Sequence, residues 1–274
     1  MTSKEEREFD ARLDHLRERL KDADDFKVKG DVFDTRTLMN IYALTKRGFI
    51  DALGGAVSTG KEANIFSAVR GDGQVAVKIY RISTSDFRAM QDYIAGDPRF
   101  GGVKGTKRSL VSAWTKKEYR NLKRAEEAGV RVPLAMTTRE NILIMEMVLQ
   151  GDDPAPMIKD VKLSHEEALR VFNLLADYVA ILYRKAELVH ADLSEFNILY
   201  NGDPVIIDMG QSLTRDHPLA EKFLMRDVAN LSRFFKKRYG IGDEEVIWEK
   251  IRSLPGRRGC DEGSESPQYA SDPA

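Results

Sequence analysis

The chain has 274 residues, of which 42% are hydrophobic, and its formal net charge at pH 7 is −1. This composition predicts one sizeable core or two lobes around a cleft, and it excludes a protein that binds polyanions through its overall charge. The single cysteine, Cys260, excludes an internal disulfide, and the lack of a long apolar run or a signal peptide predicts a cytoplasmic protein with no membrane span.

Residues 1–48 are predicted to form two helices. Residues 4 to about 24 place a thin apolar stripe among alternating charges, which is typical of an exposed amphipathic helix. The second helix covers residues 35–46, because Asp34 is a favoured N-terminal cap and Gly48 ends the periodic pattern.

Residues 49–150 are predicted to form a mostly β lobe that contains one helix. Strand-like stretches separated by turns lie at residues 49–57, 63–70, 74–80, 134–138 and 142–147. A strongly helical stretch from Ser112 stops at Gly129. Residues 83–111 are polar and have no clear period, so we expect a long flexible loop there.

Residues 151–254 are predicted to form a second, mostly helical lobe. Ser164 and Glu167 make a capping box that opens a helix over residues 166–185. Later elements are short strands near 189, 198–200 and 205–208, and helices near 218–238 and 243–254. Residues 255–274 are poor in apolar side chains and are predicted to be disordered. The expected class is α+β, with a ligand cleft between the two lobes.

The segment 55–62 nearly spells a phosphate-binding P-loop. Glu62 stands where the Mg²⁺-binding hydroxyl should be, and the residues after it alternate as a strand instead of opening a helix. We therefore expect a hairpin loop in which Ser58, Thr59 and Lys61 lie over phosphates. By itself, this segment is better explained as a simple tight turn.

A lysine on the third strand supports the interpretation of the hairpin as a phosphate-binding loop. Residues 75–78 read Val-Ala-Val-Lys, the pattern of a kinase lysine that neutralises the α- and β-phosphates of ATP. Such a lysine needs a glutamate on the next helix, and Glu118 lies in the middle of that helix. The alternative interpretation of Glu118 is a solvated surface charge.

The most specific pattern lies in residues 188–210. Asp192 is followed five residues later by Asn197, then by a turn, and then by the Asp-x-Gly of Asp208. This is the order of a kinase catalytic loop and metal site, in which Asp192 orients or accepts the hydroxyl proton and Asn197 with Asp208 holds Mg²⁺. His190 is expected to orient the loop and not to act as a base.

These motifs resemble the RIO atypical protein kinases, and in particular a minimal, archaeal-like form of the RIO-one subgroup. The segments that carry the resemblance are 58–66, 75–80, Trp114 with 117–123, 188–200 and 206–212. The loop His190-Ala191-Asp192 favours this subgroup over the RIO-two type, whose loop reads His-Gly-Asp and which has an N-terminal winged helix.

The resemblance implies a two-lobed protein-kinase-like fold with a reduced helical lobe. It also implies an autophosphorylating serine/threonine kinase or ATPase that uses ATP with Mg²⁺, or Mn²⁺, in maturation of the small ribosomal subunit on a pre-ribosomal particle. Backbone groups of Glu146 and Val148 would meet adenine, and Asp208 would form a transient aspartyl-phosphate.

Two departures from ordinary kinases bear on this expectation. Only 66 residues follow Asp208, without an Ala-Pro-Glu signal, so ATP hydrolysis is better supported than phosphorylation of a peptide. Ala191 replaces the arginine that in ordinary kinases pairs with a phosphorylated activation loop. Regulation by activation-loop phosphorylation is therefore not expected.

Two other functions stay open at this point. One is a peptide kinase with a cytosolic substrate, and the other is a pseudokinase-like RNA- or protein-binding module. The second would use the basic segment 104–124, in which eight lysines and arginines are interrupted by one acidic residue, Glu118.

Overall fold

The structure is a computed structural model that describes residues 33–82, 90 and 106–256. The helix predicted for residues 4–24, the predicted loop from 83 to 105 apart from Met90, and the tail after 256 lie outside the described residues.

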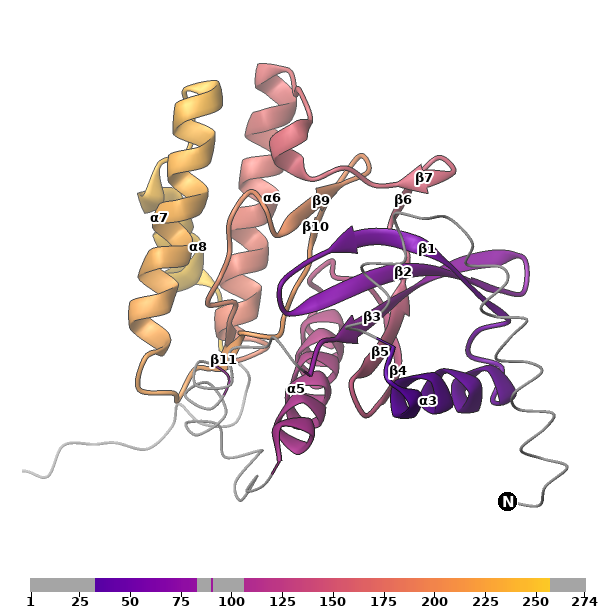
Figure 1. The fold of residues 1–274 in the computed structure, drawn as a ribbon. Coiled ribbons are helices and arrows are strands. Elements are labelled where there is room, and N and C mark those ends of the chain that lie inside the picture. Colours follow the sequence, from indigo (N-terminus) through magenta and orange to yellow (C-terminus); the bar gives the residue numbers. More distant parts are fainter. Residues whose placement is uncertain (1–32, 83–89, 91–105, 257–274) are drawn as a thin grey trace, which may run out of the picture.

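Five strands form one antiparallel sheet in the order β1-β2-β3-β5-β4 (Figure 1). Their bounds are β1 (Ala52–Thr59), β2 (Ala63–Arg70), β3 (Gly73–Tyr80), β4 (Ala135–Arg139) and β5 (Ile142–Glu146). The first three strands are the predicted meander, and β3 pairs Lys78 with Leu143 of β5. The pairing of β1 with β2 shifts register on both sides of Ala56, so the strand is irregular where it approaches its loop.

Two helices cover opposite faces of this sheet. Side chains alternate along β3, so Val75 and Val77 pack with α3 (Thr35–Lys46), whereas Ala76 shares the core of α5 (Lys107–Ala128). Asp34 caps α3 by accepting the Thr37 N–H at 2.7 Å, as the sequence predicts.

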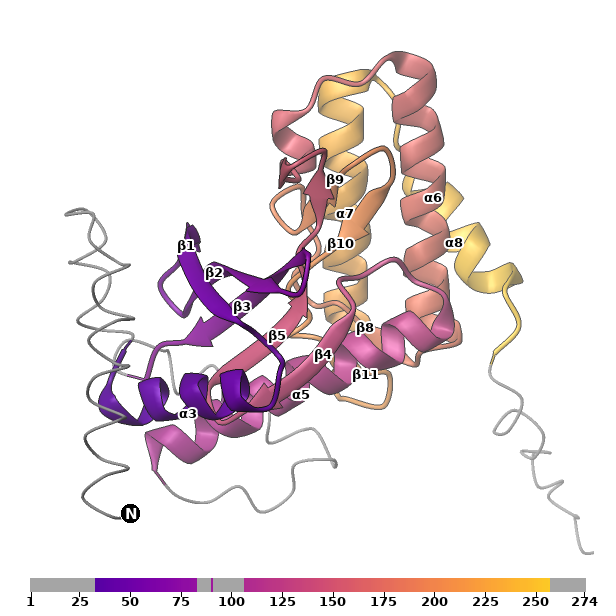
Figure 2. The ribbon, with the colours of Figure 1, turned by 90° about the vertical axis from the view of Figure 1, so that its right-hand side faces the viewer.

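Three helices form the second lobe. They are α6 (His165–Arg184), α7 (Ala220–Tyr239) and α8 (Glu244–Ser253), which Figure 2 shows gathered on one side of the sheet. Their apolar faces share one core, and Ser164 caps α6 by accepting the Glu167 N–H. The predicted α+β order, a sheet lobe followed by a helical lobe, is confirmed.

Short elements connect the two lobes and carry the loops between them. A hairpin of β6 (Leu149–Gln150) and β7 (Asp153–Pro154) and a 3₁₀ turn η2 (Ile158–Asp160) follow the sheet. The antiparallel pair of β8 (Leu188–Val189) with β11 (Leu213–Thr214) flanks the segment 190–212. That segment contains a second antiparallel pair, β9 (Ile198–Tyr200) with β10 (Pro204–Ile206).

The predicted start of the helix in the first lobe is wrong. The loop expected to run to residue 111 ends by Thr106, because Thr106 caps α5 and the helix begins at Lys107. Lys107, Arg108 and Ser109 are polar and form the first turn, so no apolar period marks it. Among the described residues, no helix is long and apolar enough to cross a membrane.

Candidate active site

A cavity of about 860 Å³ lies between the sheet and the helical lobe. Its lining includes the β1–β2 loop, the strand β3, the connection after β5 and the segments around Asn197 and Asp208. This is the size and position of a small-molecule site between lobes.

The β1–β2 loop is a hairpin turn and not a P-loop. β1 continues to Thr59, and β2 begins at Ala63 where a P-loop would open a helix. Ser58 and Lys61 line the cavity, whereas Thr59 is not among its lining residues. The expected roles of these three residues stay predictions.

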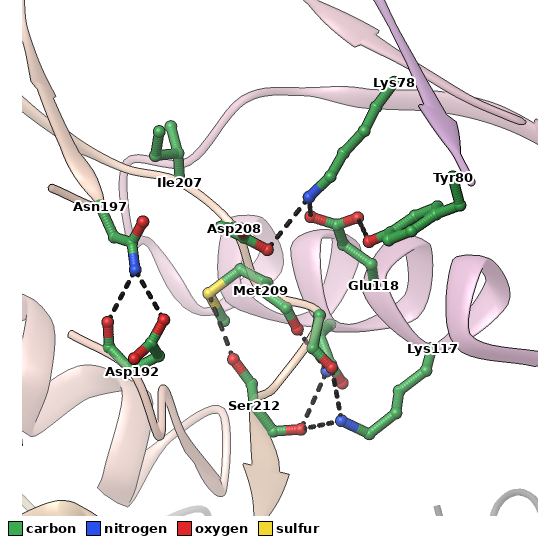
Figure 3. Close-up of polar contacts among 12 residues, drawn as sticks. Lys78, Tyr80, Lys117, Glu118, Asp192, Asn197, Ile207, Asp208, Met209 and Ser212 are labelled. Carbon is green, nitrogen blue, oxygen red and sulfur yellow. Dashed lines mark hydrogen bonds and ion pairs between the residues drawn. The ribbon is translucent and has the colours of Figure 1, made fainter. Parts of the chain in front are cut away.

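Lys78, Glu118 and Asp208 form one cluster (Figure 3), of which Lys78 and Asp208 line the cavity. The Lys78 Nζ lies 2.7 Å from Glu118 Oε1 and 3.0 Å from Asp208 Oδ1. Glu118 is 1% exposed, so it is not the solvated charge that the helix pattern also allowed. Tyr80, which the sequence did not single out, donates its hydroxyl to the other oxygen of Glu118.

Charge pairing sets the protonation of this cluster. Burial acts to lower the pKa of Lys78, but Asp208 and Glu118 outweigh it and hold that pKa well above its ordinary value. Desolvation acts to raise the pKa of Asp208, but the Lys78 ammonium outweighs it and lowers that pKa. Asp208 therefore stays ionised, and 49% of its side chain is exposed toward the cavity.

Asp192 and Asn197 lie across from this cluster, on the loop that the sequence predicts to be catalytic and that is called the catalytic loop below. The Asn197 Nδ2 donates to the backbone oxygen of Asp192 at 2.8 Å and to its Oδ2 at 3.1 Å. Desolvation raises the pKa of Asp192, against the effects of His190 and Asn197. The loop therefore presents a carboxylate that binds a proton more readily than an ordinary aspartate does.

His190 orients the loop, as the sequence predicts. It is 2% exposed, its Nδ1 accepts the Asp192 N–H at 3.3 Å, and its Nε2 lies 3.0 Å from the oxygen of Ile207. When Nδ1 accepts, Nε2 must donate, so the ring ties the catalytic loop to the residue before Asp208.

Helix α7 holds the catalytic loop through its backbone. Asp227 accepts the N–H groups of Ala191 at 2.7 Å and Leu193 at 2.9 Å, while Arg226 donates to the Ala191 oxygen. Ala191 has φ 65°, the left-handed region that side chains disfavour, so the surrounding bonds maintain an unfavourable backbone. Asp227 is 1% exposed, and burial raises its pKa to about 6 against these N–H groups.

Sequence reasoning missed Asp227, although a signal was present. In α7 the residue falls among Leu224, Val228 and Leu231, at positions that share the apolar face of a helix. A carboxylate on such a face must find hydrogen-bond donors, which marks it as a structural or functional residue.

The connection after β5 lies beside the expected adenine site. Glu146 and Val148 both line the cavity, as do Met145 and Met147. The Glu146 carboxylate turns to Arg131, with oxygen–nitrogen distances of 2.8 and 2.5 Å, so only its backbone can serve a base. The Val148 oxygen accepts the Ala155 N–H at 2.9 Å.

The donor set around Asp208 suits a hard divalent cation. Both protons that Asn197 is shown to donate go to Asp192, so its amide oxygen is the atom available to a ligand, and Asp208 supplies an ionised carboxylate nearby. Oxygen donors of this kind are those that Mg²⁺ prefers. The described residues contain no cluster of three or more histidine, cysteine, aspartate or glutamate side chains that could hold a metal, so a bound ion would complete its coordination with other oxygens.

Comparison with known proteins decides the family. The RIO domain model matches residues 64–246. The RIO-type serine/threonine-protein kinase Rio1 of Haloferax volcanii is 46% identical over 255 residues, covering 92% of this chain and 87% of that protein. The Rio1 protein of Methanocaldococcus jannaschii is 41% identical and covers 87% and 82%.

The chain belongs to the RIO family of serine/threonine protein kinases. A human RIO family member, the serine/threonine-protein kinase RIO1, is 41% identical, but the match covers 80% of this chain and only 39% of the human protein. The Rio2 kinase structure from Chaetomium thermophilum has a TM-score of 0.61 at 23% identity, covering 81% of this chain and 69% of that one, which shows the same protein-kinase-like fold. The predicted family and fold class are confirmed.

Proposed function

We propose that this RIO family member is an ATP- and Mg²⁺-dependent serine/threonine kinase and ATPase. One observation carries the proposal. Lys78, Asn197 and Asp208 line a single cavity, although Lys78 lies more than a hundred residues before the other two in the chain. Asn197 is also hydrogen-bonded to Asp192.

Nucleotide binding follows from the lining of the cavity. Adenine would lie against the apolar connection after β5 and bond to backbone groups of Glu146 and Val148. Lys78 would bind the α- and β-phosphates, because its ammonium is held in place by the hydrogen bond to Glu118. Ser58 and Lys61 at the hairpin would cover the phosphates from above.

The metal would bind Asn197 and Asp208. When bound, Mg²⁺ neutralises charge on the phosphates and aligns them for transfer. A crystal structure of the Chaetomium thermophilum Rio2 kinase, 22% identical to this chain, is described as a complex with ADP, Mg²⁺ and phosphoaspartate. That description supports the cofactor assignment, and we extend it to Mn²⁺ as a substitute ion.

Asp192 would orient the attacking hydroxyl and take its proton. Its raised pKa improves it as a proton acceptor, and the bond from Asn197 aims its carboxylate. The attacking oxygen forms a bond to the γ-phosphorus while the bond to the β-phosphate oxygen breaks and ADP leaves.

The same site can also hydrolyse ATP through a covalent step. A carboxylate oxygen of Asp208 would attack the γ-phosphorus, release ADP and form an aspartyl-phosphate, which water would then hydrolyse. We propose that this cycle acts in small-subunit maturation on a pre-ribosomal particle, with autophosphorylation as an accompanying activity.

The binding-module alternative loses support from the pairing of its basic residues. In the described part of segment 104–124, Arg108 pairs with Asp34, Lys123 with Glu126 at 3.1 Å, and Arg124 with Glu187 at 2.5 Å. Lys117 is fully buried. At least these four basic residues therefore already serve contacts within the chain.

The test follows γ-labelled ATP with Mg²⁺ and separates free phosphate, acid-stable phosphoprotein and hydroxylamine-labile phosphoprotein. The variants are Asp192→Ala and Asp208→Ala, and Asp216→Ala is the control because its carboxylate is exposed and does not line the cavity. We expect both site variants to lose turnover and the control to keep it.

The labelled species separate the two chemical routes. Hydroxylamine-labile label that disappears only without Asp208 supports the aspartyl-phosphate. If the wild type turns over no faster than Asp192→Ala, even with pre-ribosomal particles added, the enzymatic proposal fails.

A further inference from the structure

Lys117, next to Glu118 on α5, is a fully buried lysine outside the cavity. Its Nζ lies 2.7 Å from the backbone oxygen of Gly210 and 2.6 Å from that of Ser212 (Figure 3). Both oxygens belong to the segment directly after Asp208. A buried cation is costly to desolvate, and an apolar side chain of similar length would avoid that cost. Packing alone therefore does not account for the lysine.

Asn121, one helical turn after Lys117, also binds this backbone segment. Its Nδ2 donates to the oxygen of Met209 at 2.9 Å and to that of Ser212 at 3.2 Å. Residues 117 and 121 are four apart and so lie on the same face of α5. Together these two side chains bind the backbone oxygens of Met209, Gly210 and Ser212.

Close packing allows α5 to reach this backbone. A Cβ atom at Gly210 would lie 3.0 Å from the Trp114 Nε1 and 3.3 Å from the Tyr80 hydroxyl, so a side chain there would require these neighbours to shift by a few tenths of an ångström. The Lys117 Nζ also lies 5.1 Å from the centre of the Trp114 ring, which gives the cation a further partner.

The backbone after Asp208 needs external support because Asp208 has an unfavourable backbone conformation. Asp208 has φ 62°, in the left-handed region, and such a backbone persists only when its surroundings fix it. Lys78 binds the Asp208 side chain from the cavity side, whereas Lys117 and Asn121 bind the following backbone from the side of α5. The direction of the Asp208 carboxylate therefore depends on both sets of contacts.

We propose that Lys117 is a positioning residue for the metal site, with Asn121 in support. It sets the backbone from which Asp208 presents its carboxylate to Mg²⁺. Because Lys117 and Glu118 are adjacent, a single helix fixes both the phosphate-binding lysine and the metal-binding aspartate. The inference rests on the proposed function, in which Asp208 holds Mg²⁺.

The test measures ADP binding by isothermal titration calorimetry on the full chain across a range of Mg²⁺ concentrations. It compares the wild type with Lys117→Met, Lys117→Arg and Lys116→Met. Lys116 is the matched control, because it is the neighbouring lysine on the same helix and its side chain is exposed.

We expect Lys117→Met to raise the Mg²⁺ concentration for half-maximal effect by about 10-fold to 100-fold, the usual result of losing a residue that orients a metal ligand. ADP affinity without Mg²⁺ should stay within about twofold, because Lys117 does not line the cavity. Lys117→Arg should recover part of the Mg²⁺ response, and Lys116→Met should match the wild type.

If Lys117→Met fails to fold, Asn121→Ala provides a second test. This variant removes the hydrogen bonds from Asn121 to Met209 and Ser212 and leaves the buried Lys117 in place. The Mg²⁺ concentration for its half-maximal effect should also rise. Variants at both positions that titrate like Lys116→Met would overturn the inference alone. A wild type whose ADP binding does not respond to Mg²⁺ would overturn the proposed metal site and the inference with it.

Discussion

The two halves of the active site are held in different ways. On the sheet side, Lys78, Glu118 and Asp208 fix one another through charged side chains. On the helical side, α7 holds the loop of Asp192 through backbone groups, two of them bound by Asp227.

The difference shows in the two aspartates. Lys78 lowers the pKa of Asp208, whereas desolvation raises that of Asp192. In the proposed function, the carboxylate that is kept charged serves as the metal ligand and the other takes a proton. Two residues of the same type thus receive different roles from their surroundings.

The largest expected effect separates these roles. Asp208→Asn should lower turnover by about a thousandfold or more, because it removes a charge that acts on the phosphates, and it should abolish the effect of Mg²⁺ on ADP binding. Asp192→Asn should lower kcat by about a hundredfold or more and leave that Mg²⁺ effect intact. Steady-state kinetics and calorimetry measure both. Loss of the Mg²⁺ effect in Asp192→Asn would show that the halves do not act separately.

The next effect concerns the backbone support of the helical half. The pKa of Asp227 is raised from 3.8 to about 6, so the folded protein binds this proton more tightly than the unfolded chain does. The resulting stabilisation is complete below about pH 4 and is lost as the pH rises through about 6. Asp227→Asn cannot ionise, so the unfolding free energy of the wild type relative to this variant should fall by up to about 3 kcal/mol across that window.

Urea denaturation of both proteins at several pH values between 4 and 7 measures this difference. The comparison cancels other titrating groups that the two proteins share. A difference that stays constant over the window would mean that the amides of Ala191 and Leu193 stabilise the Asp227 carboxylate enough to offset its burial.

The smallest expected effect lies in the sheet half. Tyr80→Phe removes the hydroxyl that donates to Glu118 but leaves the 2.7 Å contact between Glu118 and Lys78. Stability should fall by roughly 1–2 kcal/mol, because a buried oxygen loses its donor. The kcat should fall less than about tenfold, because Lys78 remains paired with Glu118 and a typical hydrogen bond contributes a net of about 0.5–1.5 kcal/mol, whereas tenfold needs about 1.4 kcal/mol. A larger kcat loss would show that Tyr80 itself orients Lys78.

The sequence predicted the parts of the fold and site that depend on local pattern. Alternation and turn residues located the meander, and the spacing of Asp192, Asn197 and Asp208 located the residues that the segment 188–210 contributes to both halves of the site. Glu118 could be proposed as the partner of Lys78 because a known pattern links them, and the structure brings them to 2.7 Å.

Contacts that join distant segments could not be predicted in this way. Lys117 lies within a run of basic residues and looks like surface charge, yet it is buried against the backbone after Asp208. Asp227 binds N–H groups more than thirty residues away, and no local period encodes such a pairing. The start of α5 was missed because its first turn consists of polar residues.

Ala191 also limits which sequences this loop can accept. Its side chain is fully buried and its backbone is left-handed, so a β-branched or longer residue would meet both a steric and a backbone penalty. Glycine adopts the same backbone without that penalty. The His-Ala-Asp loop of this chain and the His-Gly-Asp loop of the RIO-two type therefore both satisfy one steric requirement. Within the RIO family, variation at this position should be confined to the two smallest residues.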